Sequence, residues 1–154
     1  MHNSITVVIS ALAASAAALP RTNTADLKFR QQEPLGYWPA TDFREACSPG
    51  GCISSFELTA PEGYYGNAPG FSVHCHPVFI QQQWTDCDPV GEQKVGSRVQ
   101  AMWTEASERE HLKIAVSHTW TEEPTTAYNA SGAIEVGSGV SSFEVPILLI
   151  TGIA

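Results

Sequence analysis

The feature that most constrains the fold is an alternation of apolar and polar residues that begins after Cys52 and returns in several separate runs. Side chains with a period of two lie on opposite faces of a β-strand, so each run predicts a strand with one buried face. We expect strands over residues 55–60, 71–76, 78–84, 98–103, 112–120, 128–136 and 143–147.

Clusters of Gly, Pro, Asn and Asp separate these runs, and about seven short strands spaced by such turns are typical of an all-β fold, an antiparallel β-sandwich or a small β-barrel. The polar run 104–111 is predicted to be a hairpin connection. Pro146 cannot donate to a strand ladder, which places the last predicted strand at an edge or a bulge. The apolar residues 147–154 are too few for a lipid-anchor tail of roughly 10–20 residues and are predicted to form a buried terminal strand.

The first 18 residues have the pattern of a cleaved secretory signal peptide. An apolar run over residues 5–12 passes into a stretch of small residues, and cleavage after Ala16 or Ala18 fits the small-x-small rule. The run is too short to span roughly 30 Å of bilayer hydrocarbon. We therefore expect a secreted, extracellular protein.

Export changes how the four cysteines are interpreted, because an even number in a secreted chain indicates disulfides. Three pairings are open, and we favour Cys47–Cys52, which closes a tight loop, and Cys75–Cys87, which joins the ends of two strands. Chain entropy predicts stabilisation of roughly 2 and 3 kcal/mol respectively. A zinc site made of four thiolates is disfavoured, since the spacing lacks paired C-x2-C motifs.

Residues 19–46 show neither helical nor strand periodicity. They are predicted to be an N-terminal arm or a pro-segment, with Tyr37 and Trp38 as apolar anchors that dock it onto a sheet. The remaining residues, 47–154, are predicted to form a single β domain.

The charge balance excludes two classes of partner. Eight basic and sixteen acidic residues give a net charge of −8. Nucleic acids and anionic membranes are bound through basic clusters, so neither is expected as a partner. No phosphate loop, dinucleotide fingerprint or calcium loop occurs, and no cofactor is expected.

Three histidines are candidate functional groups. Alternation puts His74 and His76 on one face of a strand, about 7 Å apart, a geometry that can supply two metal ligands. No third ligand can be assigned from the sequence, so we expect surface histidines and no metal. His118 has the parity of Val116 and Trp120, which predicts an inward-facing, hydrogen-bonded structural residue.

No catalytic constellation is predicted. No G-x-S-x-G motif surrounds any serine, and Gly137-Ser138-Gly139 is predicted to be a hairpin connection. Glycoside hydrolysis needs two acids facing each other across a cleft. Turns and solvated faces account for the available candidates, which are Asp86, Asp88, Glu105 and Glu122.

Exposed aromatic side chains offer a surface for stacking on sugars. Trp103 and Trp120 have the parity of aliphatic neighbours and are predicted to fill the core. Trp84 and the Tyr64-Tyr65 loop remain as a candidate ligand surface.

A modification site is predicted at Asn129, the first residue of an Asn-Ala-Ser glycosylation sequon. Alternation puts Asn129 on the face opposite Tyr128 and Ala130, which is consistent with an outward side chain.

Three segments together resemble the family of the Alternaria major allergen and its elicitor relatives, among fungal small secreted proteins. They are Ser54–Leu58, then Gly70-Phe71-Ser72-Val73-His74-Cys75, and then Gln83-Trp84-Thr85-Asp86-Cys87. Residues 115–120 and 128–132 also resemble strands of small secreted fungal proteins. The chain lacks the second, C-terminal cysteine pair of that family.

The resemblance implies an antiparallel β-sandwich or barrel without enzymatic activity, a Cys75–Cys87 bridge, and binding to plant defence proteins. We therefore expect a secreted effector- or elicitor-like protein that acts by non-catalytic binding to extracellular proteins. The alternative is an extracellular carbohydrate-binding or hydrolytic protein of the cell wall, and a third option is a structural cell-wall component.

Overall fold

The strands of this protein are antiparallel to all their neighbours, and no helix occurs in the part of the chain that the structure describes. The computed structural model describes residues 33–153 except 50, 79–82, 109–110 and 123–125. The strands in these residues are β1 (Tyr37–Ser48), β2 (Gly51–Ala60), β3 (Phe71–Cys75), β4 (Thr85–Asp86), β5 (Asp88–Pro89), β6 (Arg98–Glu108), β7 (His111–Glu122), β8 (Thr126–Gly137), β9 (Phe143–Pro146) and β10 (Leu149–Ile153).

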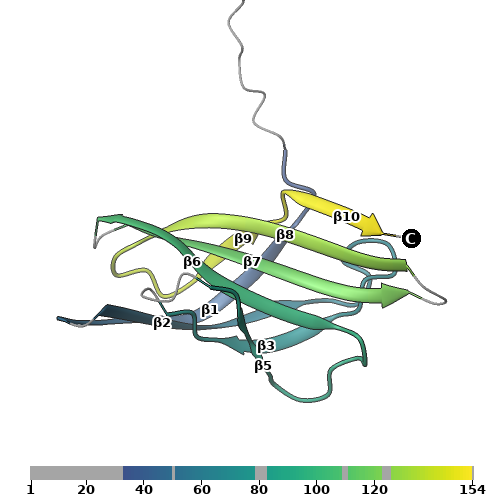
Figure 1. Ribbon diagram of the computed structural model, residues 1–154, viewed down its shortest axis with the longest axis horizontal. Helices are drawn as coiled ribbons and strands as arrows, with labels where there is room; N and C mark the ends of the chain where they lie inside the picture. The colour runs from purple at the N-terminus through teal and green to yellow at the C-terminus, as the bar shows by residue number, and fades with distance from the viewer. Residues whose placement is uncertain (1–32, 50, 79–82, 109–110, 123–125, 154) are drawn as a thin grey trace, which may run out of the picture. The chain divides into compact units, whose positions relative to one another are not determined.

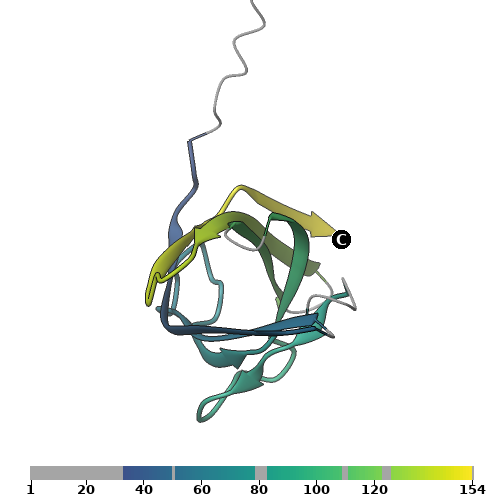
Figure 2. The same ribbon diagram turned by 90° about the vertical axis from the view of Figure 1, so that its left-hand side faces the viewer.

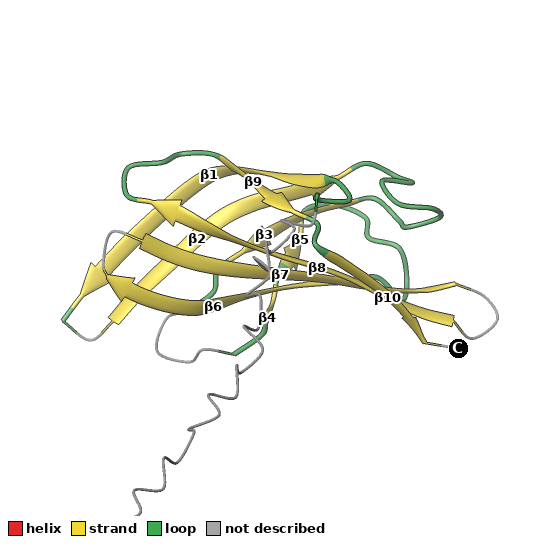
Figure 3. Ribbon diagram, turned by 90° about the horizontal axis from the view of Figure 1, so that it is seen from above, coloured by secondary structure: helices red, strands yellow, loops and turns green. Residues whose placement is uncertain are grey.

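The strands form two five-stranded sheets that face each other (Figures 1 and 3). One has the order β5-β3-β2-β1-β9 and the other the order β10-β8-β7-β6-β4. The predicted alternation is visible in β3, where Phe71, Val73 and Cys75 are buried and His74 is exposed. The all-β prediction, with two packed antiparallel sheets, is confirmed.

The two sheets are joined along both edges because two strand paths change sheet. The chain leaves one sheet after β4 and enters the other at β5, with Cys87 between them. It crosses between the sheets a second time from β9 to β10, with Ile147 between them. If β4–β5 and β9–β10 are each counted as one path, the ten described strands become eight paths. Each path pairs with the next along the chain, and β9 pairs with β1, so the meander closes into a flattened barrel (Figure 2).

The seam between β1 and β9 completes this closure. Tyr37 lies opposite Pro146 in the ladder. The amide of Leu35 donates to the carbonyl of Ile147 at 2.8 Å, and the Ile147 amide donates to Gly36 at 2.9 Å. Strand β9 is the last strand of its sheet, as predicted from Pro146.

The interior is filled by side chains from both sheets. Aromatic rings meet edge-on at one point, where Phe143 lies 5.4 Å from both Phe43 and Phe56. The largest fully buried side chains come from six strands and the β9–β10 connection: Trp38, Trp103, Phe56, Leu58, Leu112, Ile114, Ile147, His118, Val73, Val99, Val116 and Val145.

One glycine allows β9 to leave its sheet. Gly132 lies opposite the buried Val116 and therefore faces the interior. A Cβ at this position would lie 1.8 Å from the carbonyl oxygen of Pro146. The chain at Pro146 therefore passes directly over Gly132, where any side chain would block it.

The expected N-terminal arm, residues 19–46, is the main point at which the structure differs from the prediction. Residues 19–32 lie outside the described part, but β1 begins at Tyr37 and lies inside its sheet, between β2 and β9. The compact unit accordingly spans Gln32–Ala154 rather than beginning at residue 47. The alternation of apolar and polar residues in β1 is interrupted, because Asp42 has a φ of 53° and the register with β2 shifts between Thr41 and Arg44. The sequence pattern therefore did not predict this strand.

Smaller differences concern short or exposed strands. Of the strand expected over residues 78–84, the described part shows only an isolated bridge between Val78 and Ile53, and the strand forms later as β4. The polar run 104–111 is largely strand, since β6 extends to Glu108 and β7 begins at His111. The terminal strand forms as β10, an edge strand. The prediction of burial was wrong for Leu148 and Leu149, which are 37% and 53% exposed, whereas Ile147 is buried. No helix long and apolar enough to cross a membrane occurs in the described residues.

Candidate functional site

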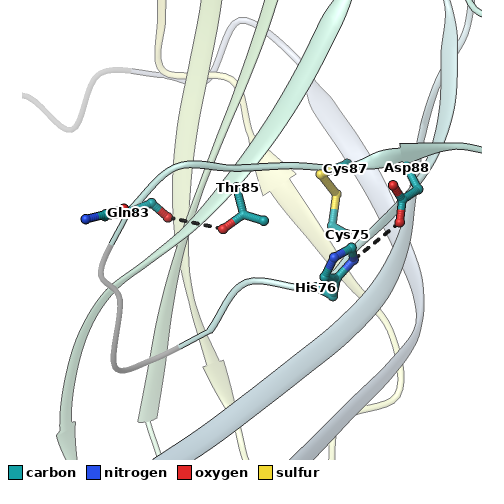
Figure 4. The surroundings of a disulfide bond; sticks show 6 residues. All are labelled: Cys75, His76, Gln83, Thr85, Cys87 and Asp88. Atoms are coloured by element: carbon teal, nitrogen blue, oxygen red, sulfur yellow. Dashed lines mark hydrogen bonds and ion pairs between the residues drawn. A yellow bond between two sulfur atoms is a disulfide. The ribbon is translucent and has the colours of Figure 1, made fainter.

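Both predicted disulfides are present, and all four sulfurs are used. Cys47–Cys52 joins opposite residues of β1 and β2, near their hairpin. Cys75–Cys87 joins the end of β3 to the residue between β4 and β5 (Figure 4). No thiolate is left for a zinc site, because none of these cysteines is free.

His118 faces the interior, as its parity predicts, and is fully buried. Its Nδ1 lies 2.8 Å from the Tyr64 hydroxyl and its Nε2 lies 2.8 Å from Ser97 Oγ. A hydroxyl can both donate and accept, so the two partners satisfy either neutral tautomer. Desolvation lowers the pKa of His118 from 6.5 to about 4, so the imidazole is neutral at physiological pH.

Tyr64 is less exposed than a surface aromatic would be, because its side chain is partly buried and packs against the core. Its ring packs edge-on against Trp38 at 5.8 Å and Phe71 at 6.2 Å, and its hydroxyl reaches His118. Burial raises the pKa of Tyr64, while the neighbouring Trp38 side chain opposes this in part. A turn between β2 and β3 carries the side chain into contact with β1, β3 and β7.

Trp84 and Tyr65 are exposed as predicted, at 42% and 43%. Trp84 directly precedes β4. Tyr65 belongs to the turn that carries Tyr64, and its carbonyl accepts a hydrogen bond from the Ala68 amide at 2.9 Å. These are separate exposed rings on two different loops. Trp103 and Trp120 are both buried in the core, as predicted.

Asn129 lies in β8 on the face opposite the buried Ala130. Its side-chain amide is half-buried and donates to Ser117 Oγ at 2.7 Å across the β7–β8 ladder. Glycosylation of Asn129 stays a prediction.

Exposed apolar side chains gather at the seam where the barrel closes. Leu35 is 50% exposed, Tyr37 53%, Leu148 37% and Leu149 53%. The two segments that carry them lie side by side, since Leu35 is bonded to Ile147. We call these four residues the apolar corner.

A hollow of about 590 Å³ adjoins the apolar corner and shares Tyr37 with it. Its apolar lining includes Ile134 of β8 and Phe143 of β9, and its rim carries Glu144. Large exposed apolar patches next to a concave surface mark protein interaction sites more often than chance. The apolar corner and this hollow are the candidate functional site.

No local pattern in the sequence marks this site. Leu35 and Tyr37 fell in the predicted arm, and residues 147–154 were expected to be buried. The one available signal was the Tyr37-Trp38 pair, in which Trp38 is buried and Tyr37 points outward. The pairing of β1 with β9 brings the two halves of the site together across more than a hundred residues of chain.

Comparison with known proteins provides no relative. No protein-family model, no curated protein and no solved structure matches the chain.

Proposed function

We propose that this chain is a secreted protein that acts outside the cell by non-catalytic binding to another extracellular protein, in the manner of a fungal effector or elicitor. The observation that carries the proposal is the apolar corner, in which four large apolar side chains remain exposed at the closing seam of a packed barrel. The plant extracellular space is the proposed place of action, and a plant defence protein is the proposed partner class.

The composition of the corner suits protein recognition. A buried aromatic or aliphatic anchor at the centre of an interface typically supplies most of the binding energy, with a polar rim around it. Tyr37 has the character of such an anchor, since its ring is half exposed and lines the hollow. Thr41, Ser142 and Glu144 line the same hollow and supply the polar groups.

The charge of the chain favours a basic partner. The net charge of −8 attracts proteins of opposite sign and speeds their encounter. Export is supported by the N-terminal pattern and by the two disulfides, which persist in oxidising compartments.

A second function is favoured by one specific observation, the exposure of Trp84 and Tyr65. An exposed indole can stack on the apolar face of a sugar ring, so a cell-wall carbohydrate is the alternative ligand. In this case recognition would depend on Trp84 and not on the apolar corner.

The test is capture from plant extracellular fluid with the mature, disulfide-bonded protein as bait. We compare it with a Tyr37→Ser/Leu149→Ser variant and with Val95→Ser as the matched control, because Val95 is 98% exposed and lies outside the corner. Captured proteins are identified by mass spectrometry, purified and titrated against each bait.

The proposal expects one partner whose affinity falls at least about 10-fold in the double variant, since interface anchors are each worth about 2 kcal/mol or more. The control is expected to bind like the wild type. Equal binding by the double variant refutes the corner as the recognition surface. A glycan array with Trp84→Ala separates the alternative, since a sugar signal that is lost in this variant favours carbohydrate binding.

A further inference from the structure

We propose that the outer face of β3 and β5 binds a divalent transition metal ion, of the Zn²⁺ or Cu²⁺ class, through His74, His76 and Asp88. The inference rests on a tripeptide on each side of the Cys75–Cys87 disulfide. His74-Cys75-His76 and Asp86-Cys87-Asp88 are held together by that bridge, with a Cα–Cα distance of 4.3 Å.

The bridge decides which way the flanking side chains point. Cys75 is fully buried and Cys87 is 7% exposed, so both sulfurs face the interior. Residues next to an inward-facing residue point outward in a strand. His74, His76 and Asp88 are all exposed, and Figure 4 shows His76 and Asp88 pointing toward one another beside the disulfide.

The register brings a carboxylate opposite the histidine pair. His74 is the direct ladder partner of Asp88, and His76 Nδ1 lies 3.7 Å from Asp88 Oδ2. Two ligand atoms that bind one tetrahedral ion at ~2.0–2.1 Å lie about 3.3 Å apart. His76 and Asp88 are therefore within a few tenths of an ångström of the separation that a shared ion requires.

The third ligand needs only a side-chain rotation. The rings of His74 and His76 are 6.1 Å apart and inclined at 28°. Two imidazoles on one ion have centroids about 5–6 Å apart, given the ~2.0–2.1 Å metal–nitrogen bond. His74 is exposed, so it can turn its ring nitrogen toward the ion with little loss of packing.

The chemistry of this ligand set suits a borderline metal. Two imidazoles and one carboxylate form a set that zinc accepts, and the fourth position stays open to water or a partner's side chain. On the other side of His74, its second ladder partner Glu57 supplies an additional carboxylate. Glu57 and His74 line a hollow of about 320 Å³ with Asp42, Arg44 and Ser55.

Calorimetric titration of the mature, disulfide-intact protein with ZnCl₂, and separately with CuCl₂, tests the proposal. We expect one ion per chain, and an affinity at least about 10-fold weaker in His74→Gln, His76→Gln and Asp88→Asn, because even an outer partner of a ligand is worth about 10–100-fold. His111→Gln is the matched control, since His111 begins β7 in the other sheet, and it should bind like the wild type.

Heteronuclear NMR with substoichiometric Cu²⁺ provides the second readout, because paramagnetic broadening is confined to residues near the ion. The amides of residues 74–76 and 87–88 should broaden first. The proposal is overturned if no heat is detected up to millimolar metal, if the three ligand variants bind like the wild type, or if broadening centres on another site. It does not depend on the proposed function, because partner capture and metal binding are measured separately and either can fail alone.

Discussion

Gly132→Ala is predicted to destabilise the barrel by about 3 kcal/mol, at the upper end of the usual overpacking range. The added Cβ would lie 1.8 Å from the Pro146 carbonyl oxygen and 2.9 Å from its carbonyl carbon. Both atoms are backbone, so no flexible side chain can move aside. Relief requires the β9–β10 crossover to shift away from β8, which disturbs the seam with β1.

The assay is urea unfolding under non-reducing conditions, followed by tryptophan fluorescence. With a slope near 2 kcal/mol per M for a domain of this size, the midpoint should fall by about 1.5 M. If the slope of the unfolding free energy against urea is unchanged, the surface area exposed on unfolding is the same in variant and wild type. The shift in midpoint then measures a change in stability.

The same strand offers the control. In Gly137→Ala the new Cβ would have no atom within 4 Å, and the backbone at Gly137 is not left-handed. This variant should be neutral or more stable by up to about 1 kcal/mol, because alanine reduces the entropy of the unfolded chain. If the two variants differ by less than about 0.5 kcal/mol, Pro146 does not pass over Gly132 and the described closure is wrong.

Three further outcomes are expected. Folding lowers the pKa of His118 from 6.5 to about 4, so the unfolded state binds the proton first as the pH falls. About 3 kcal/mol of unfolding free energy is therefore lost between pH 6.5 and pH 4. A His118→Gln variant should lack this loss in urea titrations, and the same pH dependence in the variant and the wild type would contradict the burial of His118. Replacing Cys75 and Cys87 by serine should lower the unfolding free energy by about 3 kcal/mol, as expected for closing a loop with a separation of 12 residues, and an unchanged midpoint would count against the bridge. Thermal melts should distinguish the buried Trp103 from the exposed Trp84. Trp103→Ala should destabilise the protein by about 3–5 kcal/mol, and Trp84→Ala should be close to neutral. Similar losses of stability in the two variants would contradict the burial of Trp103 and the exposure of Trp84.

The sequence predicted the fold wherever alternation was uninterrupted. In β3, Phe71, Val73 and Cys75 face inward as their period of two requires, and the same pattern correctly placed His118 and Trp103 in the core. The burial of such residues can be predicted locally, because a strand with one buried face alternates apolar and polar residues along the chain. Both favoured disulfide pairings, one closing a tight loop and one joining the ends of two strands, are confirmed.

Prediction failed where burial depends on distant residues. A left-handed backbone at Asp42 and the adjacent register shift broke the alternation of β1, which hid a strand. Tyr64 looked like a loop residue, and only the folded chain shows that its turn reaches back to Trp38 and His118. The exposure of Leu149 arises because β10 pairs only with β8, which no local pattern encodes.

The seam of β1 with the β9–β10 crossover closes the barrel, and we propose that the apolar corner at this seam is the recognition surface. Methyl-resolved NMR of leucine-labelled protein, titrated with the purified protein captured from plant extracellular fluid, tests it most directly. The methyl resonances of Leu35, Leu148 and Leu149 should shift saturably, while those of the buried Leu58 and Leu112 stay in place. Saturable binding that leaves all three corner leucines unshifted would contradict the account.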